Sequence, residues 1–119
     1  MDPTPAQLVD FWLCLPSTGM GRAESRFFAD ELLDDWVRES PKLVWDFLLE
    51  ISGRTLKDKQ ISMLGAGLLE TLLSMHGAEF ISSVEREAAR NETFKRILRG
   101  VWQSSTPDSI WSRVQKAQQ

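Results

Sequence analysis

Cysteine, histidine and tyrosine are scarce in this 119-residue sequence, which has one Cys, one His and no Tyr. The single cysteine, Cys14, cannot form an internal disulfide or a thiolate metal cluster, which favours a reducing cytoplasmic setting. Long hydrophobic runs are also missing, because the longest stretches, 11–15 and 47–49, fall far below the roughly 20 apolar residues of a membrane-spanning helix. Segment 1–5 has no basic residue ahead of its apolar neighbours, unlike a secretory signal. These absences predict a soluble cytoplasmic protein that does not act in a membrane.

The composition is that of one globular domain over residues 1–119. Hydrophobic residues make up 42% of the chain and charged residues 26%, a balance that excludes a disordered or fibrous protein. The net charge of −3 is unevenly spread. Residues 1–50 have ten acidic and four basic side chains, whereas residues 51–119 have seven acidic and ten basic side chains. Such a molecule attracts a charged partner to one end only, and its low pI does not favour general nucleic-acid binding.

Apolar residues recur every three or four positions along most of the chain, whereas no useful stretch alternates as a strand would. This pattern predicts an all-α fold, a compact stack of about eight short antiparallel helices in an irregular HEAT-like bundle. Breaks are expected at Gly65–Gly67 and at Gly77, and Asn91 is a plausible helix boundary. The expected helices span about 5–15, 23–38, 41–52, 55–64, 68–76, 80–90, 92–102 and 107–117.

The most unusual segment is an acidic run around the helix expected at 23–38. Its carboxylates belong to Asp30, Glu31, Asp34, Asp35 and Glu39. Acidic residues four positions apart are neighbours on a helix, and each such pair destabilises it by about 0.2–0.5 kcal/mol. Only Arg38, four residues after Asp34, is spaced to relieve this repulsion.

Three interpretations of the acidic run are open. It can be a solvated face that balances an apolar helix, a docking surface for a basic protein, or a divalent-metal site. Metal ions normally take carboxylates from more than one segment, and no second acidic helix of this density exists. No His and Cys spacing fits a metal site, and no phosphate-binding loop follows either glycine pair, so we expect neither metal nor cofactor.

An alternative site is centred on the only histidine, His76, which precedes Gly77 at an expected helix end. In that position it packs partly against the core and caps the last carbonyls of the helix. A catalytic role requires an orienting partner, for which Glu70, Glu79 and, through folding, Arg113 are the candidates. Glu70 lies about 240° around the helix from His76, so these two do not easily share a face.

The carboxy-terminal half is basic and contains Trp102 and Trp111, a combination that can bind nucleic acid. Intervening glutamates and the expected core position of both rings favour salt-bridged, solvated helix surfaces instead. Tryptophan is also enriched at interface hot spots, so Trp12, Trp36 or Trp45 can anchor a partner.

Residues 67–77, Gly-Leu-Leu-Glu-Thr-Leu-Leu-Ser-Met-His-Gly, carry a family resemblance together with 80–81, 101–102 and 111–114. The sequence resembles a family of small bacterial domains with a Gly-x-Leu-Glu-x-Leu-Leu-x-x-His-Gly core. It departs from the family pattern at Leu68, where a proline is expected, and at Thr71, where an acidic residue is expected. The resemblance implies a bacterial or phage origin and an all-helical fold, without an established activity.

The acidic run favours a non-enzymatic protein-binding module, such as an inhibitor or immunity protein, that docks a basic partner. The rival is a small enzyme or cofactor-binding protein with a site around Glu70 and His76. A third hypothesis is a homodimer formed through an exposed apolar helix face.

Overall fold

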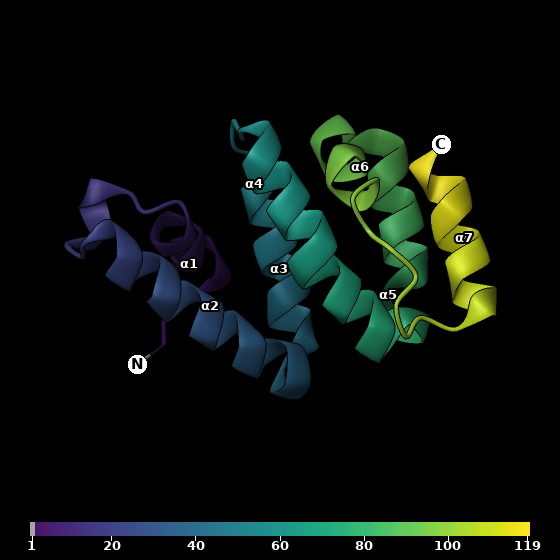
Figure 1. The fold of residues 1–119 in the computed structure, drawn as a ribbon, viewed down its shortest axis with the longest axis horizontal. Coiled ribbons are helices and arrows are strands. Elements are labelled where there is room, and N and C mark those ends of the chain that lie inside the picture. Colours follow the sequence, from purple (N-terminus) through teal and green to yellow (C-terminus); the bar gives the residue numbers. More distant parts are fainter. Residues whose placement is uncertain (1) are drawn as a thin grey trace. The chain divides into compact units, whose positions relative to one another are not determined.

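The computed structural model describes residues 2–119, and this part of the chain is helical with no strand. Its contacts divide the chain into two compact units, Met1–Ile51 and Ser52–Gln119. The single domain expected over residues 1–119 stays a prediction, and each unit is described separately (Figure 1). The first unit contains α1 (Pro5–Trp12), η1 (Pro16–Thr18), α2 (Arg22–Glu39) and α3 (Pro41–Ile51). The second contains α4 (Asp58–Met63), the π-helical η2 (Leu64–Leu69), α5 (Glu70–Arg90), α6 (Glu92–Leu98) and α7 (Asp108–Gln118).

Helix α1 begins at Pro5, as expected, and ends at Trp12, earlier than the expected residue 15. Thr4 and Gln7 form a capping box, with Gln7 N donating to Thr4 Oγ1 at 3.1 Å and Thr4 N donating to Gln7 Oε1 at 2.8 Å. The helix ends at Trp12 because Cys14 has a left-handed backbone with φ of 60°. Cys14 N then donates to Phe11 O and Leu15 N to Asp10 O, the two hydrogen bonds of a Schellman motif.

The first unit encloses a core between α1, α2 and α3, which pack against one another pairwise. Trp12, Trp36 and Trp45 are only 4%, 5% and 7% exposed, so the hypothesis that one of them anchors a partner is wrong. The Arg26 guanidinium lies 3.9 Å from the Trp12 ring centroid, and Arg26 Nε donates to Trp12 O at 2.8 Å. Arg26 therefore connects α2 to the end of α1.

After residues 52–57, the second unit continues from α4 through η2 into α5 without an intervening loop. The break predicted at 65–67 is instead a π-helical turn. A Cβ atom at Gly65 would overlap the Ile97 carbonyl oxygen, so only glycine permits this approach to the end of α6. The stop predicted at Gly77 is a kink, because His76 has non-helical φ and ψ of −136° and 28° while the helix continues.

This continuity corrects the predicted helix count. The expected helices at 55–64 and 68–76 are continuous through η2, and the expected boundary near 77 is a kink within α5. Residues 2–119 contain seven α-helices and two short 3₁₀ and π segments. The HEAT-like arrangement stays a prediction. None of the helices in the described residues is both long and apolar enough to cross a membrane.

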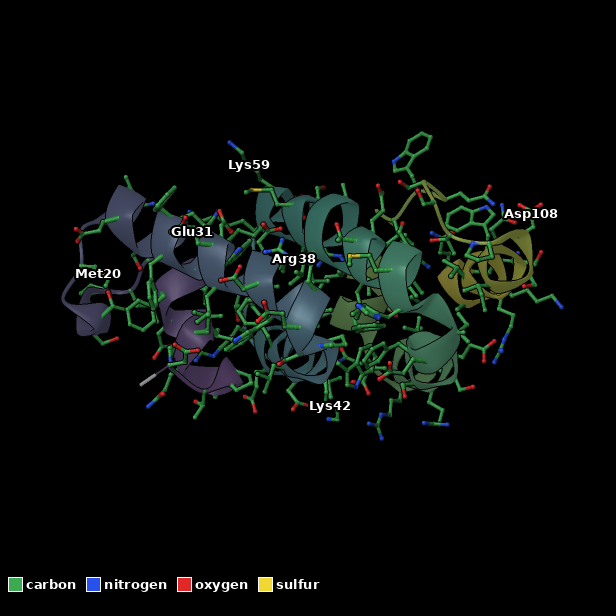
Figure 2. The ribbon with its side chains drawn as sticks, turned by 90° about the horizontal axis from the view of Figure 1, so that it is seen from below. Met20, Glu31, Arg38, Lys42, Lys59 and Asp108 are labelled. Carbon is green, nitrogen blue, oxygen red and sulfur yellow. The ribbon has the colours of Figure 1, made fainter. Side chains whose placement is uncertain are left out.

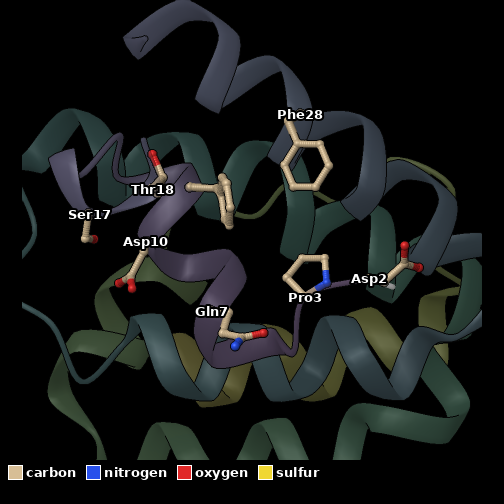
Figure 3. A pocket seen from close by; sticks show the side chains of 8 residues that line it. Asp2, Pro3, Gln7, Asp10, Ser17, Thr18 and Phe28 are labelled. Atoms are coloured by element: carbon tan, nitrogen blue, oxygen red, sulfur yellow. The ribbon is translucent and has the colours of Figure 1, made fainter. Parts of the chain in front are cut away.

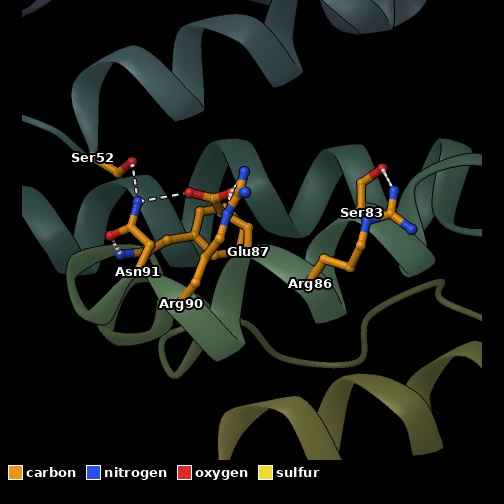
Figure 4. A network of polar contacts seen from close by, with 7 residues as sticks. Ser52, Ser83, Arg86, Glu87, Arg90 and Asn91 are labelled. Atoms are coloured by element: carbon orange, nitrogen blue, oxygen red, sulfur yellow. Dashed lines mark hydrogen bonds and ion pairs between the residues drawn. The ribbon is translucent and has the colours of Figure 1, made fainter.

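The α5–α6 junction confirms the boundary predicted at Asn91. The side-chain oxygen of Asn91 accepts from Phe94 N at 3.0 Å and caps α6. Its amide nitrogen donates to Ser52 Oγ and to Glu87 Oε2, both at 2.9 Å (Figure 4). Glu87 is nearly buried and also pairs with Arg90. One side chain therefore connects the start of this unit to α5 and α6.

Helix α7 packs against α5 and α6. Gly77 allows a close approach of α5 to α7, because a Cβ there would lie 3.0 Å from Ile110 Cγ2. Helix α7 begins at Asp108, one residue after the expected start at 107, and Pro107 is its cap residue. Thr106 is buried, and its N–H donates to Gln103 O at 2.8 Å.

Candidate functional site

Helix α2 places the five predicted acidic residues on the solvent-exposed part of the first unit. Its opposite side is buried against α1 and α3 through Ser25, Ala29, Leu33, Trp36 and Val37. The exposed acidic residues are Asp30, Glu31, Asp34, Asp35 and Glu39. Figure 2 shows Glu31 and Arg38 along this helix and Met20 in the connection before it.

The carboxyl-terminal half of the acidic face is partly neutralised by Arg38. Its guanidinium contacts Asp34 Oδ2 at 3.1 Å and Asp35 Oδ1 at 2.8 Å. The hydrogen bond to Asp34 and the charges of the surrounding carboxylates raise the pKa of Arg38. The contact with Asp34 confirms the relief expected from its spacing, and Asp35 shares the same arginine, so two of the five carboxylates are compensated. Exposed ion pairs of this kind contribute little stability.

Asp30 is held at the edge of the face next to Arg26 and Trp12. Partial burial raises the pKa of this carboxyl, while the charge of Arg26 and a hydrogen bond to Trp12 act in the opposite direction. Asp30 therefore belongs partly to the α1–α2 contact.

An exposed aromatic ring, Phe27, lies among the carboxylates that remain. Its side chain is 64% exposed on α2. Helical spacing places Glu24 three residues before it and Glu31 four residues after it on the same face. We call Glu24, Phe27 and Glu31 the Phe27 surface. It combines an apolar ring with two negative charges, whereas Asp34 and Asp35 are already paired.

Sequence reasoning missed Phe27, although a signal was available. At 3.6 residues per turn, Phe27 lies about 160° around α2 from the buried Ala29. A large aromatic residue on the far side of an apolar stripe is a candidate for an exposed anchor.

Two residues of the alternative site, Glu70 and Arg113, have hydrogen-bond partners outside the predicted set. Glu70 Oε1 accepts from Trp102 N at 2.9 Å and thereby holds the loop after α6. Arg113 Nε donates to Glu85 Oε2 at 3.0 Å. Glu85 is nine residues beyond His76, about 13 Å along α5. His76 is half-buried and Glu79 is exposed.

The ion pair between Glu85 on α5 and Arg113 on α7 shifts the pKa of both residues. Hydrogen bonding from Arg113 lowers the pKa of Glu85, and the same bond raises the pKa of Arg113. Arg113 also donates to Ser82 Oγ at 3.2 Å. These contacts give Arg113 a role in joining α7 to α5.

The described residues show no metal cluster, and one tryptophan is exposed. Within residues 2–119, no group of three or more His, Cys, Asp or Glu side chains is placed to hold a metal ion. Trp102, which was predicted to lie in the core, is 75% exposed although its backbone N–H is held by Glu70.

Comparison with known proteins gives one match. A family model described as a family of unknown function, DUF6869, matches residues 17–119. Neither the curated proteins nor the solved structures give a match to the chain. The match covers all of α2 and every element of the second unit.

Proposed function

The chain belongs to this family of unknown function, so its activity has to be inferred from its own residues, and we propose that it is a non-enzymatic protein-binding module. In this proposal α2 docks a basic surface of another protein, as a bacterial inhibitor or immunity protein would. The carrying observation is Phe27, an aromatic side chain 64% exposed on an acidic helix face.

The Phe27 surface supplies the two contributions that a docking site needs. Burial of an exposed aromatic ring supplies affinity, and aromatic residues are frequent at interface hot spots. The carboxylates of Glu24 and Glu31 attract a basic surface and favour it over acidic competitors.

The charge of the first unit supports the same partner chemistry. Residues 1–51 have ten acidic and four basic side chains. This excess extends the attraction for a cationic partner beyond the residues in contact, up to about a Debye length of 8–10 Å at physiological salt.

The test uses an acetylated and amidated eight-residue peptide of alternating arginine and leucine as the basic probe. The variant carries Asp30→Asn, Glu31→Gln, Asp34→Asn and Asp35→Asn, and binding is measured by calorimetry at low and high NaCl. We expect roughly tenfold weaker binding with a flatter salt dependence. Stability should be unchanged or slightly higher, because like-charge repulsion is removed.

A matched pair of aromatic variants tests the role of Phe27. Phe27→Ser should weaken peptide binding roughly tenfold at both salt concentrations. Trp102→Ser removes an even more exposed ring from the second unit and should have little effect on binding. Unchanged affinity and salt dependence in both the charge variant and Phe27→Ser would refute the docking function.

A further inference from the structure

A pocket of about 480 Å³ lies beside α2 in the first unit. Its walls include the carboxylates of Asp2 and Asp10, the rings of Phe11 and Phe28, and the Thr18 side chain. Figure 3 shows Asp2 and Asp10 on opposite sides of the pocket and the Phe28 ring above Pro3. The volume is in the range of small-molecule and side-chain sites in proteins.

The local fold explains why these groups converge. The Schellman turn at Cys14 ends α1 and returns the chain through η1, so that Thr18 faces the same pocket as Asp10. The Phe11 and Phe28 ring centroids lie 5.0 Å apart with the rings tilted by 57°. Phe28 follows Phe27 and is four residues after Glu24 on α2, so the pocket adjoins the Phe27 surface.

The side chains that line the pocket favour a positively charged ligand. Two of the lining residues are acidic and, among the described residues, none that lines the pocket is basic. Aromatic faces attract guanidinium and ammonium groups, and a carboxylate beside the ring adds a charge-assisted hydrogen bond. The same unit already stacks a guanidinium on an aromatic ring, in the contact of Arg26 with Trp12 at 3.9 Å.

We propose that this pocket receives an arginine side chain from an extended basic segment of the partner protein. The inference rests on the proposed function and identifies what the partner must supply. The two carboxylates lie on opposite sides of the pocket, an arrangement that suits successive basic side chains of an extended segment (Figure 3). Arginine fits better than lysine, since its planar guanidinium both stacks on a ring and pairs with a carboxylate.

The experiment measures binding of the arginine–leucine peptide and of two analogues that carry citrulline or lysine in place of arginine. Citrulline keeps the shape of arginine and removes its charge. For the unmodified protein we expect the order arginine, lysine, citrulline, with citrulline roughly tenfold or more weaker than arginine. In NMR spectra, the backbone amide signals of Phe11, Thr18 and Phe28 should shift when the arginine peptide binds.

Substitutions of pocket residues test whether the preference for arginine arises in the pocket. Asp10→Asn and Phe28→Leu should each lower the affinity for the arginine peptide by roughly three- to tenfold. Phe28→Leu should also bind the arginine peptide no more tightly than the lysine peptide. Asp10→Glu and Phe28→Tyr keep the charge and the ring, so they should retain binding if the losses are specific. Glu50→Gln removes the same charge from an exposed position on α3 and should change affinity less than about twofold. Thermal unfolding confirms that each variant is folded.

The outcomes separate the pocket from the docking face. If Asp10→Asn and Phe28→Leu bind the arginine peptide like the unmodified protein while the neutralised α2 variant does not, the pocket inference is wrong and the proposed function stands. If the pocket variants lose binding and the neutralised α2 variant keeps it, the pocket inference is supported and the proposed docking through α2 is wrong. Acetyl-arginine-methylamide that produces the full peptide shifts at equal concentration would identify a small-cation site and overturn the assignment to a protein segment.

Discussion

Asn91 shows how much of the second unit depends on one polar side chain. It caps α6 through its oxygen and donates through its nitrogen to Ser52 and Glu87 (Figure 4). Both acceptors are almost fully buried, at 4% and 8% exposure. A buried acceptor that loses its donor keeps its desolvation cost, so the effect of removing Asn91 exceeds that of a lost helix cap.

We expect Asn91→Ala to lower the free energy of unfolding by about 2–4 kcal/mol, the sum of a lost cap and two weakened buried hydrogen bonds. Urea unfolding followed by circular dichroism measures the change. Asn91→Ser retains a capping oxygen and should recover roughly 1 kcal/mol of the loss. A loss below about 0.5 kcal/mol for Asn91→Ala would show that water replaces the Asn91 amide in this network.

The Glu85–Arg113 pair predicts a pH dependence of stability. Arg113 holds the folded pKa of Glu85 below its usual 4.5, so the unfolded chain binds this proton more readily. The pair therefore contributes stability that is complete above pH 4.5 and is lost as the pH falls through the lower folded pKa.

Glu85→Gln should accordingly reduce the free energy of unfolding at pH 7 and have a smaller effect at pH 3. Denaturant unfolding at both values provides the measurement. Glu79→Gln, at an exposed position of the same helix, is the matched control and should have little effect at either pH. An equal loss for Glu85→Gln at both pH values would point to packing and exclude the ion pair as the cause.

At the scale of the element, the stretch from α4 to α5 shows why glycine misled the helix prediction. Gly65-Ala66-Gly67 was expected to interrupt a helix, because glycine lowers helix propensity. The structure uses Gly65 for close approach to Ile97 and Gly100, within a helix that continues as a π turn. Local propensity does not contain this information, since Ile97 is 32 residues away in the sequence.

The two glycines of this turn should respond oppositely to alanine. Gly65→Ala should destabilise the protein by about 1–3 kcal/mol, because its Cβ overlaps the Ile97 carbonyl oxygen. Nothing lies within 4 Å of a Cβ at Gly67, so Gly67→Ala should raise stability by about 0.5–1 kcal/mol. Thermal and urea unfolding of both variants test this. Equal effects of the two substitutions would contradict the assigned contact.

The element that carries the proposed function, α2, was predicted almost completely. The expected span 23–38 compares with the observed Arg22–Glu39, and the five acidic residues are exposed. The contact of Arg38 with Asp34 follows the predicted four-residue spacing, whereas its contact with Asp35 was missed, because i,i+3 and i,i+4 carboxylates both lie within reach of one flexible side chain. Phe27 was missed because attention went to the charged residues of this face, although Phe27 lies outside the buried stripe of α2.

At the scale of the whole molecule, the uneven charge coincides with the division into compact units. Residues 1–51 have an excess of six acidic side chains, and residues 52–119 an excess of three basic side chains. A composition shift in the sequence therefore corresponds to a boundary in the contacts. This distribution confines attraction for a basic partner to the unit that contains α2 and the pocket.

The sequence by itself determined the helical class, most helix starts and the acidic face, because these follow from spacing, caps and proline within a few residues. Only the tertiary structure decided the rest. It buried Trp12, Trp36 and Trp45, left Phe27 exposed, and engaged Glu70 and Arg113 away from His76. It also joined α1, η1 and α2 around the pocket. The physical reason is that these outcomes depend on contacts between residues far apart in the chain, which local periodicity does not encode.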